Sequence, residues 1–264
     1  MSFDINKFDF FDTHCHLNLI ASETDVNTVI ENARNNKVFM NCVGVDYNSS
    51  VSALKIVEEN NDCCICSIGI HPESVNELNR IEELEQLIID NRPSIYGIGE
   101  CGLDFHYENY DKNAQIALFK AQIDLAIKYS LPLIIHCRDA YEELNTILKE
   151  YKDRLNKILI HCYDSDREWV QKFNEFDCYF AIGGKITYPK SDYLRDALIY
   201  IPENRLVCET DAPWLTPMPN RKDTNEPMNV ILVEKYISNL LNKNVKNALF
   251  TNSVILFNLP HKNQ

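Results

Sequence analysis

The stretch Phe8-Asp9-Phe10-Phe11-Asp12-Thr13-His14-Cys15-His16 joins a short apolar run to two histidines near the start of the chain. The same arrangement, an apolar run followed by a residue of a metal-binding type, recurs four more times. The later runs are 94–99 before Glu100, 133–135 before His136, 158–160 before His161 and 206–210 before Asp211. Active sites of parallel (β/α)8 barrels gather where the strands end. The pattern therefore predicts an α/β fold, a TIM-like (β/α)8 barrel with a metal site at the C-terminal rim of its strands.

The spacing of the candidate strand ends supports a closed barrel. They fall near His16, Val45, His71, Glu100, His136, His161, Gly183 and Asp211. Successive ends lie about 30 residues apart, which is the length of one βα unit. The whole chain has 264 residues, close to the roughly 250 typical of one such barrel. We therefore expect a single barrel domain over residues 1–264.

Helical patterns fill the intervals between these strands. The clearest covers 112–129, where Ile116, Phe119, Ile123 and Ile127 recur at three- and four-residue steps as one buried stripe. Further helices are predicted near 230–241 and 245–257. The irregular stretch 213–227 carries four prolines directly after the last candidate ligand. We expect it to form a loop over the mouth of the site.

Composition narrows the function classes. The formal net charge of −13 argues against nucleic-acid binding by a broadly basic surface. Two divalent ions offset by the carboxylates of Glu100 and Asp211 would still leave a local charge of about +2, enough to hold a phosphodiester. No apolar run approaches the roughly 20 residues of a membrane helix, and residues 1–7 are too polar for a secretion signal. A cytoplasmic protein is expected.

Ten cysteines are spread through the chain, and many stand inside apolar runs. A disulfide scaffold is the alternative, but buried reduced thiols fit a chain of this size better. Cys63 and Cys66 form a lone Cys-x-x-Cys. This spacing needs a second pair or a helix start before it indicates a zinc or redox site.

The histidines carry the strongest chemical signal. His14 and His16 are two positions apart, so on a strand both imidazoles face the same side and one ion can bind both. Two ordinary core or surface histidines are the alternative reading. Five of the seven histidines fall at strand ends (14, 16, 71, 136 and 161), whereas His106 and His261 do not. That distribution favours a metal site.

Two carboxylates complete the candidate site. Glu100 stands among glycines, and a carboxylate at the rim can bridge two ions through its two oxygens. Its alternative role is a buried glutamate paired with arginine or lysine. Asp211 can bind metal, accept a proton from a water molecule, or merely cap a turn. His136 and His161 are nitrogen donors suited to a second ion, although each alone would more often be an ordinary histidine.

Five motifs that occur in order make the chain resemble the TatD-like metal-dependent deoxyribonucleases. They are Phe11-Asp12-Thr13-His14-Cys15-His16, Gly69-Ile70-His71-Pro72, Gly97-Ile98-Gly99-Glu100-Cys101-Gly102-Leu103-Asp104, His136-Cys137-Arg138-Asp139-Ala140 and Glu209-Thr210-Asp211-Ala212-Pro213. The resemblance spans nearly the whole chain. It implies an amidohydrolase-type barrel that hydrolyses DNA phosphodiester bonds, often as a 3′ to 5′ exonuclease. It also implies two divalent ions as cofactors, for which magnesium, manganese and zinc are candidates.

The resemblance also assigns residues to roles. His14, His16 and Asp211 would hold one ion, His136 and His161 the other, and Glu100 would bridge them. His71 would lie near the substrate phosphate. From the chemistry of a two-metal site, we expect a metal-held hydroxide as nucleophile, Asp211 as general base and Glu100 as the second catalytic carboxylate. DNA, single-stranded or at its 3′ ends, is the expected partner, without a membrane.

Basic residues near the strand ends are candidate phosphate contacts. They are Arg138, Lys185, Arg221 and Lys222, and solvated surface charges are the alternative reading. Two departures from the family pattern occur nearby. Asp164-Ser165-Asp166 places two negative charges where the family has a small turn, and Glu73 replaces a common histidine. The acidic turn would hinder a phosphate approaching that loop.

Two other functions remain open. An amidohydrolase-type barrel can cleave a small-molecule ester, lactone or amide, or RNA, with the same metals. Many such enzymes bridge their metals with a carboxylated lysine on the fourth strand, where this chain has Glu100. That difference favours the nuclease. A barrel that has lost catalysis and only binds is the second alternative.

Overall fold

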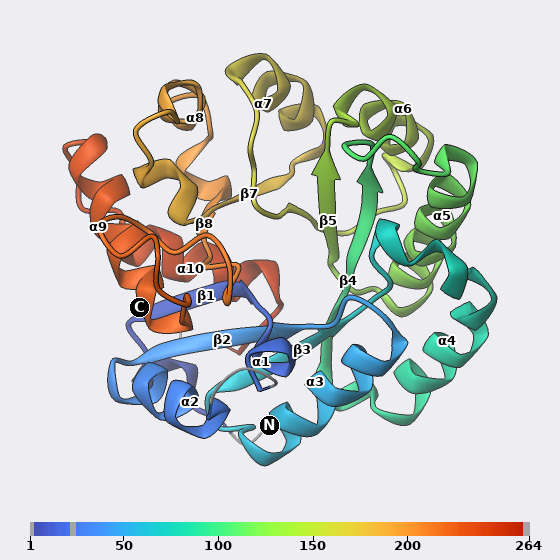
Figure 1. The fold of residues 1–264 in the computed structure, drawn as a ribbon, viewed down its shortest axis with the longest axis horizontal. Coiled ribbons are helices and arrows are strands. Elements are labelled where there is room, and N and C mark those ends of the chain that lie inside the picture. The colour runs from blue at the N-terminus through green and yellow to red at the C-terminus, as the bar shows by residue number, and fades with distance from the viewer. Residues whose placement is uncertain (1–2, 22–24, 261–264) are drawn as a thin grey trace.

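The computed structural model describes residues 3–21 and 25–260, so the predictions on His261 and on the first two residues lie outside it. Eight parallel strands follow one another around a ring in chain order (Figure 1). Their bounds are β1 Phe10–Cys15, β2 Val38–Val43, β3 Cys64–Ile68, β4 Ile95–Asp104, β5 Leu133–Arg138, β6 Ile158–Ile160, β7 Tyr179–Ile182 and β8 Leu206–Cys208. The predicted (β/α)8 barrel is confirmed.

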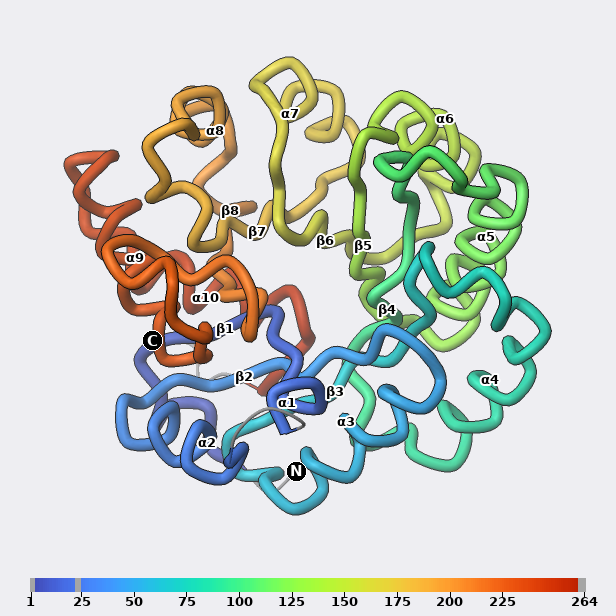
Figure 2. The backbone as a smooth tube through the Cα atoms, viewed as in Figure 1, coloured from blue at the N-terminus to red at the C-terminus, as the bar shows by residue number. Residues whose placement is uncertain are grey.

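Helices form an outer layer around the strands, as the tube view shows (Figure 2). They are α1 Leu17–Ile20, α2 Val26–Asn35, α3 Tyr47–Glu59, α4 Ile81–Asp90, α5 Lys112–Tyr129, α6 Tyr141–Tyr151, α7 Arg167–Phe173, α8 Asp192–Leu198, α9 Val230–Leu240 and α10 Lys246–Leu256. Within the described residues, none of these helices is long and apolar enough to cross a membrane. The two helices predicted in the C-terminal region each differ by one or two residues at their ends.

The first strand meets the segment that follows the last one, which closes the ring. The amide of Asp211 donates to the carbonyl of His14 at 2.9 Å, and the amide of His16 donates to the carbonyl of Ala212 at 2.8 Å. Three predicted ligands, His14, His16 and Asp211, take part in these bonds through their backbones. Closure of the barrel therefore brings the two ends of the motif series together.

Helix α5 has the bounds that the periodicity predicts. An aspartate caps its start, since the side chain of Asp111 accepts from the amide of Ala114. Phe119 and Ile123 are fully buried, whereas Ile116 and Ile127 pack against the core from its edge. The predicted stripe therefore faces the core, although only its two central residues are fully buried.

The prediction that the fourth strand ends at Glu100 is wrong, because β4 continues to Asp104. Its pairing with β5 shifts register between Ile98 and Cys101. Gly99 and Gly102 adopt φ angles of +147° and +141°, which residues with a side chain rarely tolerate. A Cβ at Gly102 would lie 2.0 Å from the carbonyl oxygen of His136. The glycines thus let an irregular strand continue in close contact with β5.

All ten cysteines are free, and only Cys162 is partly exposed. The prediction of buried reduced thiols is therefore confirmed. Cys63 lies beside Cys64, with their sulfurs 3.7 Å apart, whereas Cys66 is part of β3. The Cys63-x-x-Cys66 spacing consequently does not form a pair.

Candidate metal centre

The carboxylate of Glu100 lies at the centre of the predicted ligands. Its Oε2 atom is 3.3 Å from Nε2 of His14 and 3.6 Å from Nε2 of His16. Its Oε1 atom is 2.9 Å from Nδ1 of His136 and 2.8 Å from Nε2 of His161. Each carboxylate oxygen therefore faces its own pair of imidazoles.

The first group of ligand atoms suits one ion. The Nε2 atoms of His14 and His16 lie 3.2 Å apart, and Nε2 of His16 is 3.4 Å from Oδ1 of Asp211. Two nitrogens that bind the same zinc ion, each at about 2.0–2.1 Å, would lie about 3.3 Å apart in a tetrahedral site. The spacing within this group therefore fits a shared ion.

Local hydrogen bonds hold this first group in place. Nδ1 of His16 lies 2.9 Å from the carbonyl oxygen of Val43, which turns Nε2 toward the site. Asp12 accepts from the amide of Thr210 at 2.8 Å and from its hydroxyl at 2.5 Å. The Asp12 carboxylate thus ties β1 to the segment that carries Asp211.

Two further carboxylates support the second group. Nε2 of His136 lies 2.9 Å from Oδ2 of Asp104, opposite the nitrogen that faces Glu100. Nδ1 of His161 lies 3.6 Å from Oε1 of Glu209, which also accepts from the amide of Cys162. Carboxylates behind metal-binding histidines fix ring orientation and raise ligand basicity.

These supporting residues were not predicted, although signals for them exist. Asp104 and Glu209 both belong to motifs quoted above, and Asp12 precedes His14 by two positions. In regular strands, positions two apart share a face. Asp104 lies beyond the predicted end of the fourth strand at Glu100, so the sequence does not predict that it faces the site. Glu209 lies two residues before Asp211, which is the predicted ligand of that segment.

His71 lies closer to the cluster than a pure substrate contact requires. Its Nε2 atom is 3.5 Å from Oε1 of Glu100, and its ring meets that of His136 edge to face at 4.3 Å between centroids. His71, Glu100 and His136 therefore form a third convergent group. The predicted role at the substrate phosphate remains a prediction.

Burial and mutual charge shift the pKa values of the cluster in opposite directions. Burial alone would raise the pKa of Glu100, but the charges of His161 and His71 help to lower it well below its usual range. Burial lowers the pKa of His14 to about 4 and that of His71 to about 3. Burial also opposes protonation of His161, yet the charges of Glu100 and Glu209 raise its pKa well above the usual value. Positive charge therefore stabilises the buried Glu100 carboxylate, and either a protonated His161 or a metal ion can supply that charge.

A pocket of about 490 Å³ opens beside this cluster. His136, His161 and Asp211 line its wall on the side of the candidate ligands, while Arg138 and Lys185 supply its cationic groups. His106, predicted to lie away from the strand ends, also lines it, and its ring pairs with Asp139 at 2.7 Å. The predicted phosphate contacts Arg138 and Lys185 are thus next to the ligands.

The two aspartates of the acidic turn lie in different surroundings. The carboxylate of Asp164 faces the pocket and binds both the Lys185 ammonium and the Tyr193 hydroxyl. Asp166 instead caps α7, where its side chain accepts from the amides of Glu168 and Trp169. Of these two acidic residues, only Asp164 therefore lines the pocket.

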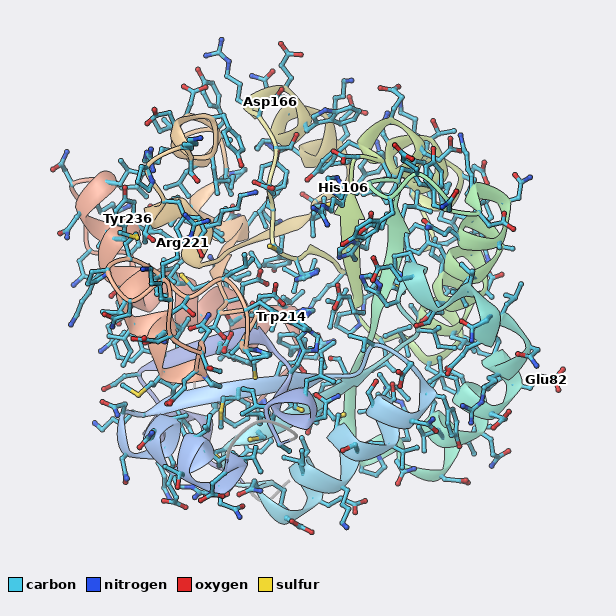
Figure 3. The ribbon with its side chains drawn as sticks, in the orientation of Figure 1. Glu82, His106, Asp166, Trp214, Arg221 and Tyr236 are labelled. Atoms are coloured by element: carbon cyan, nitrogen blue, oxygen red, sulfur yellow. The ribbon has the colours of Figure 1, made fainter. Side chains whose placement is uncertain are left out.

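Arg221 and Lys222 do not contribute to the pocket wall. Arg221 packs over the ring of Tyr188 at 4.3 Å, and Figure 3 shows it on the side of the molecule that carries α9. Lys222 is exposed. The predicted loop over the mouth is nevertheless present in part, because Trp214 and Leu215 line the pocket.

Comparisons with known proteins agree with this geometry. The sequence pattern of the TatD related DNase family matches residues 11–258. The metal-dependent hydrolase YabD of Bacillus subtilis is 36% identical over 87% of this chain and 90% of its own. A protein of a Rahnella species named 3′-5′ ssDNA/RNA exonuclease TatD is 34% identical over 81% of each chain. The crystal structure of YJJV, a TatD homologue from Escherichia coli K12, superimposes with a TM-score of 0.87 at 25% identity, covering 96% of this chain and 99% of that one.

Proposed function

Because this chain belongs to the TatD related DNase family, and is therefore a metal-dependent hydrolase, we propose that it cleaves phosphodiester bonds in DNA as a 3′ to 5′ exonuclease. The observation that carries the proposal is the position of Glu100, whose two oxygens face two pairs of imidazoles. Such an arrangement suits two adjacent divalent cations. Paired cations are a common solution for phosphodiester hydrolysis.

The chain offers ligands for both cations. His14, His16 and Asp211 would hold one, His136 and His161 the other, and Glu100 would bridge them, with His71 close enough to join the second group. Divalent cations bound there would activate a water molecule for attack and stabilise negative charge on the phosphate. Imidazole and carboxylate donors together accept zinc, manganese or magnesium.

Asp211 and the basic residues would act on the substrate directly. The Asp211 carboxylate reaches both the ligand cluster and the pocket, so it can accept the proton of an attacking water molecule. Its pKa lies below the usual value, because the hydrogen bond to His16 and the charge of His161 outweigh its burial. Arg138 and Lys185 would bind the phosphates that flank the cleaved bond.

A direct test follows the cleavage of labelled strands. Single-stranded DNA oligonucleotides labelled at the 3′ or the 5′ end are incubated with metal-stripped protein, to which magnesium, manganese or zinc is returned. We expect stepwise loss from the 3′ end only when metal is present, and excess chelator should abolish it. An RNA strand of the same sequence, a duplex and a panel of small esters and lactones run in parallel.

The variant Asp211→Asn provides the matched control, since it keeps the size of the side chain. Turnover should fall about 10³-fold, within the range for loss of a general base or a charge-stabilising group. Circular dichroism should be unchanged. Wild-type turnover in this variant would refute the role of Asp211. Hydrolysis of a small ester without cleavage of any nucleic acid would transfer the proposal to that substrate class.

A further inference from the structure

Trp214 is an exposed aromatic side chain at the edge of the catalytic pocket. It lines the pocket and remains 50% exposed, so a ligand in the pocket can reach its aromatic face. Figure 3 shows Trp214 near the middle of the ring of strands, with His106 on the side of β4 and β5. The indole therefore lies at the wall of the pocket beside the ligand cluster.

The backbone that carries this ring is firmly held. The amide of Trp214 donates to the carbonyl of Asp211 at 2.9 Å. Its own carbonyl accepts from the side chain of Asn225 at 2.6 Å, and Asn225 is fully buried. A flat apolar surface in a fixed position can bind a planar ligand at little conformational cost.

The indole also lies directly beside the ligand cluster. Its ring centroid is 5.2 Å from that of His16, with the planes inclined at 61°. A planar group resting on Trp214 would consequently be one nucleotide or less from a phosphate at the cluster. Nucleobases are planar groups that stack on aromatic side chains without regard to sequence.

Two of the cationic or titratable side chains of the pocket wall are paired with carboxylates. Lys185 is paired with Asp164, and His106 with Asp139. The protein as a whole carries a formal charge of −13. Arg138 is therefore the one cationic side chain among the pocket-lining residues for which no ion pair is described, and an apolar contact would add to its hold on a strand.

We propose that Trp214 stacks on the nucleobase next to the cleaved phosphodiester and so positions the end of the strand. This inference rests on the proposed function, because it assumes a nucleic-acid substrate. A base inside a duplex has both faces covered by its neighbours. It can rest on Trp214 only after it leaves that stack, so the contact selects for unpaired ends.

Tryptophan fluorescence tests the contact without relying on catalysis. The chain has two tryptophans, and Trp169 packs against Tyr141 and Phe173, with 5.6 Å between ring centroids in each case. The variant Trp169→Phe keeps that packing and leaves Trp214 as the single reporter. Metal-loaded Trp169→Phe protein is titrated with a phosphorothioate oligothymidine and with a base-free strand of equal charge. Saturable quenching by the oligothymidine alone is expected.

Kinetics with Trp214→Leu and Trp214→Phe provide the second measurement. For a single-stranded oligonucleotide, Trp214→Leu should raise KM about tenfold, the range of one base–aromatic stack, with a smaller change in kcat. Trp214→Phe should recover most of the loss. The two variants should cleave an oligonucleotide with an abasic 3′-terminal nucleotide at wild-type KM.

The outcomes separate this inference from the proposed function. Cleavage of DNA by the wild type, without quenching and with unchanged KM in Trp214→Leu, would overturn the stacking contact and leave the nuclease intact. Base-specific quenching without cleavage of any strand would support the contact and refute the nuclease. Equal quenching by the base-free strand would overturn the contact.

Discussion

The two ends of the barrel interior differ sharply, although the same strands build both. At the N-terminal end, the second residue of most strands is apolar. These residues are Phe11, Phe39, Ile65, Ile134, Leu159 and Val207, which belong to one buried cluster. We call this cluster the floor. At the other end stand the imidazoles and carboxylates of the ligand cluster.

Along a strand, the inward-facing side chains change from apolar to polar within about two residues, which is one repeat of the strand. His136 comes two residues after Ile134, and His161 two residues after Leu159. Between the two ends lies a hydrogen-bonded layer, in which Asn41 donates to the carbonyl of Thr13 at 3.0 Å and accepts from the hydroxyl of Ser67 at 3.0 Å. The floor consists of packed apolar side chains, and the rim carries the candidate ligands. Substitutions in the floor should therefore change stability, whereas substitutions at the rim should change metal binding and activity.

The largest effect is expected from Glu100→Ala at the rim. Removing the carboxylate that faces both imidazole pairs should lower activity by about 10³-fold or more, as loss of a charge-stabilising group does, and should reduce bound metal. Metal content by mass spectrometry and turnover measure this. Glu82→Ala on the exposed face of α4 removes the same charge and should change neither. Full metal content in Glu100→Ala would contradict the bridging role.

Phe39→Ala should show the opposite behaviour at the floor. Phe39 is fully buried and contacts Phe11 edge to face, with 5.1 Å between ring centroids. Its loss should cost about 3–5 kcal/mol of unfolding free energy, measured by urea denaturation. Protein that remains folded should retain its metal and its KM. The exposed Ile89→Ala serves as control, and loss of metal from folded Phe39→Ala would show that the two ends are not separable.

A smaller effect is expected behind the ligands. Asp104→Asn removes the charge that His136 meets on the side away from Glu100. Metal affinity should fall about 10- to 100-fold, as for other carboxylates that orient ligand histidines. Calorimetric titration of the stripped protein measures it, with the exposed Asp90→Asn as control. If the two variants bind metal equally, Asp104 does not act through His136.

The smallest effect concerns the pocket wall. Asp164→Ser frees Lys185 from its ion pair, in which both side chains are about one third exposed. If Lys185 binds phosphate, KM for an oligonucleotide should fall about two- to fivefold. This factor corresponds to the free energy of one surface ion pair. In a Lys185→Met background, Asp164→Ser should have no such effect. The same decrease in both backgrounds would indicate that Asp164 repels the phosphate directly.

Sequence periodicity predicted the regular parts of this molecule well. Apolar runs and their spacing indicated eight strands, and α5 has the predicted bounds. The candidate ligand residues, which the structure brings close together, stand out because they follow apolar runs at a repeated place. In both cases the signal is local, and it follows from which face of an element is buried.

The missed features depend on contacts between distant segments. The extension of β4 to Asp104 results from close packing of Gly99 and Gly102 against β5, which no local pattern encodes. Likewise, the pairing of Lys185 with Asp164 joins residues of two different loops. Hydrogen bonds and ion pairs of this kind need the assembled barrel.

The closure of the ring has a consequence for how the chain matures. The bonds between His14 and Asp211 and between His16 and Ala212 join the first strand to the segment that follows the eighth strand, which is synthesised much later. A chain still growing on the ribosome would carry both histidines long before it carries the aspartate that faces them. Under the proposed assignment, the full ligand set of that cation would therefore form only after the eighth strand has docked, and the bound cation would hold the first strand to the segment after the eighth.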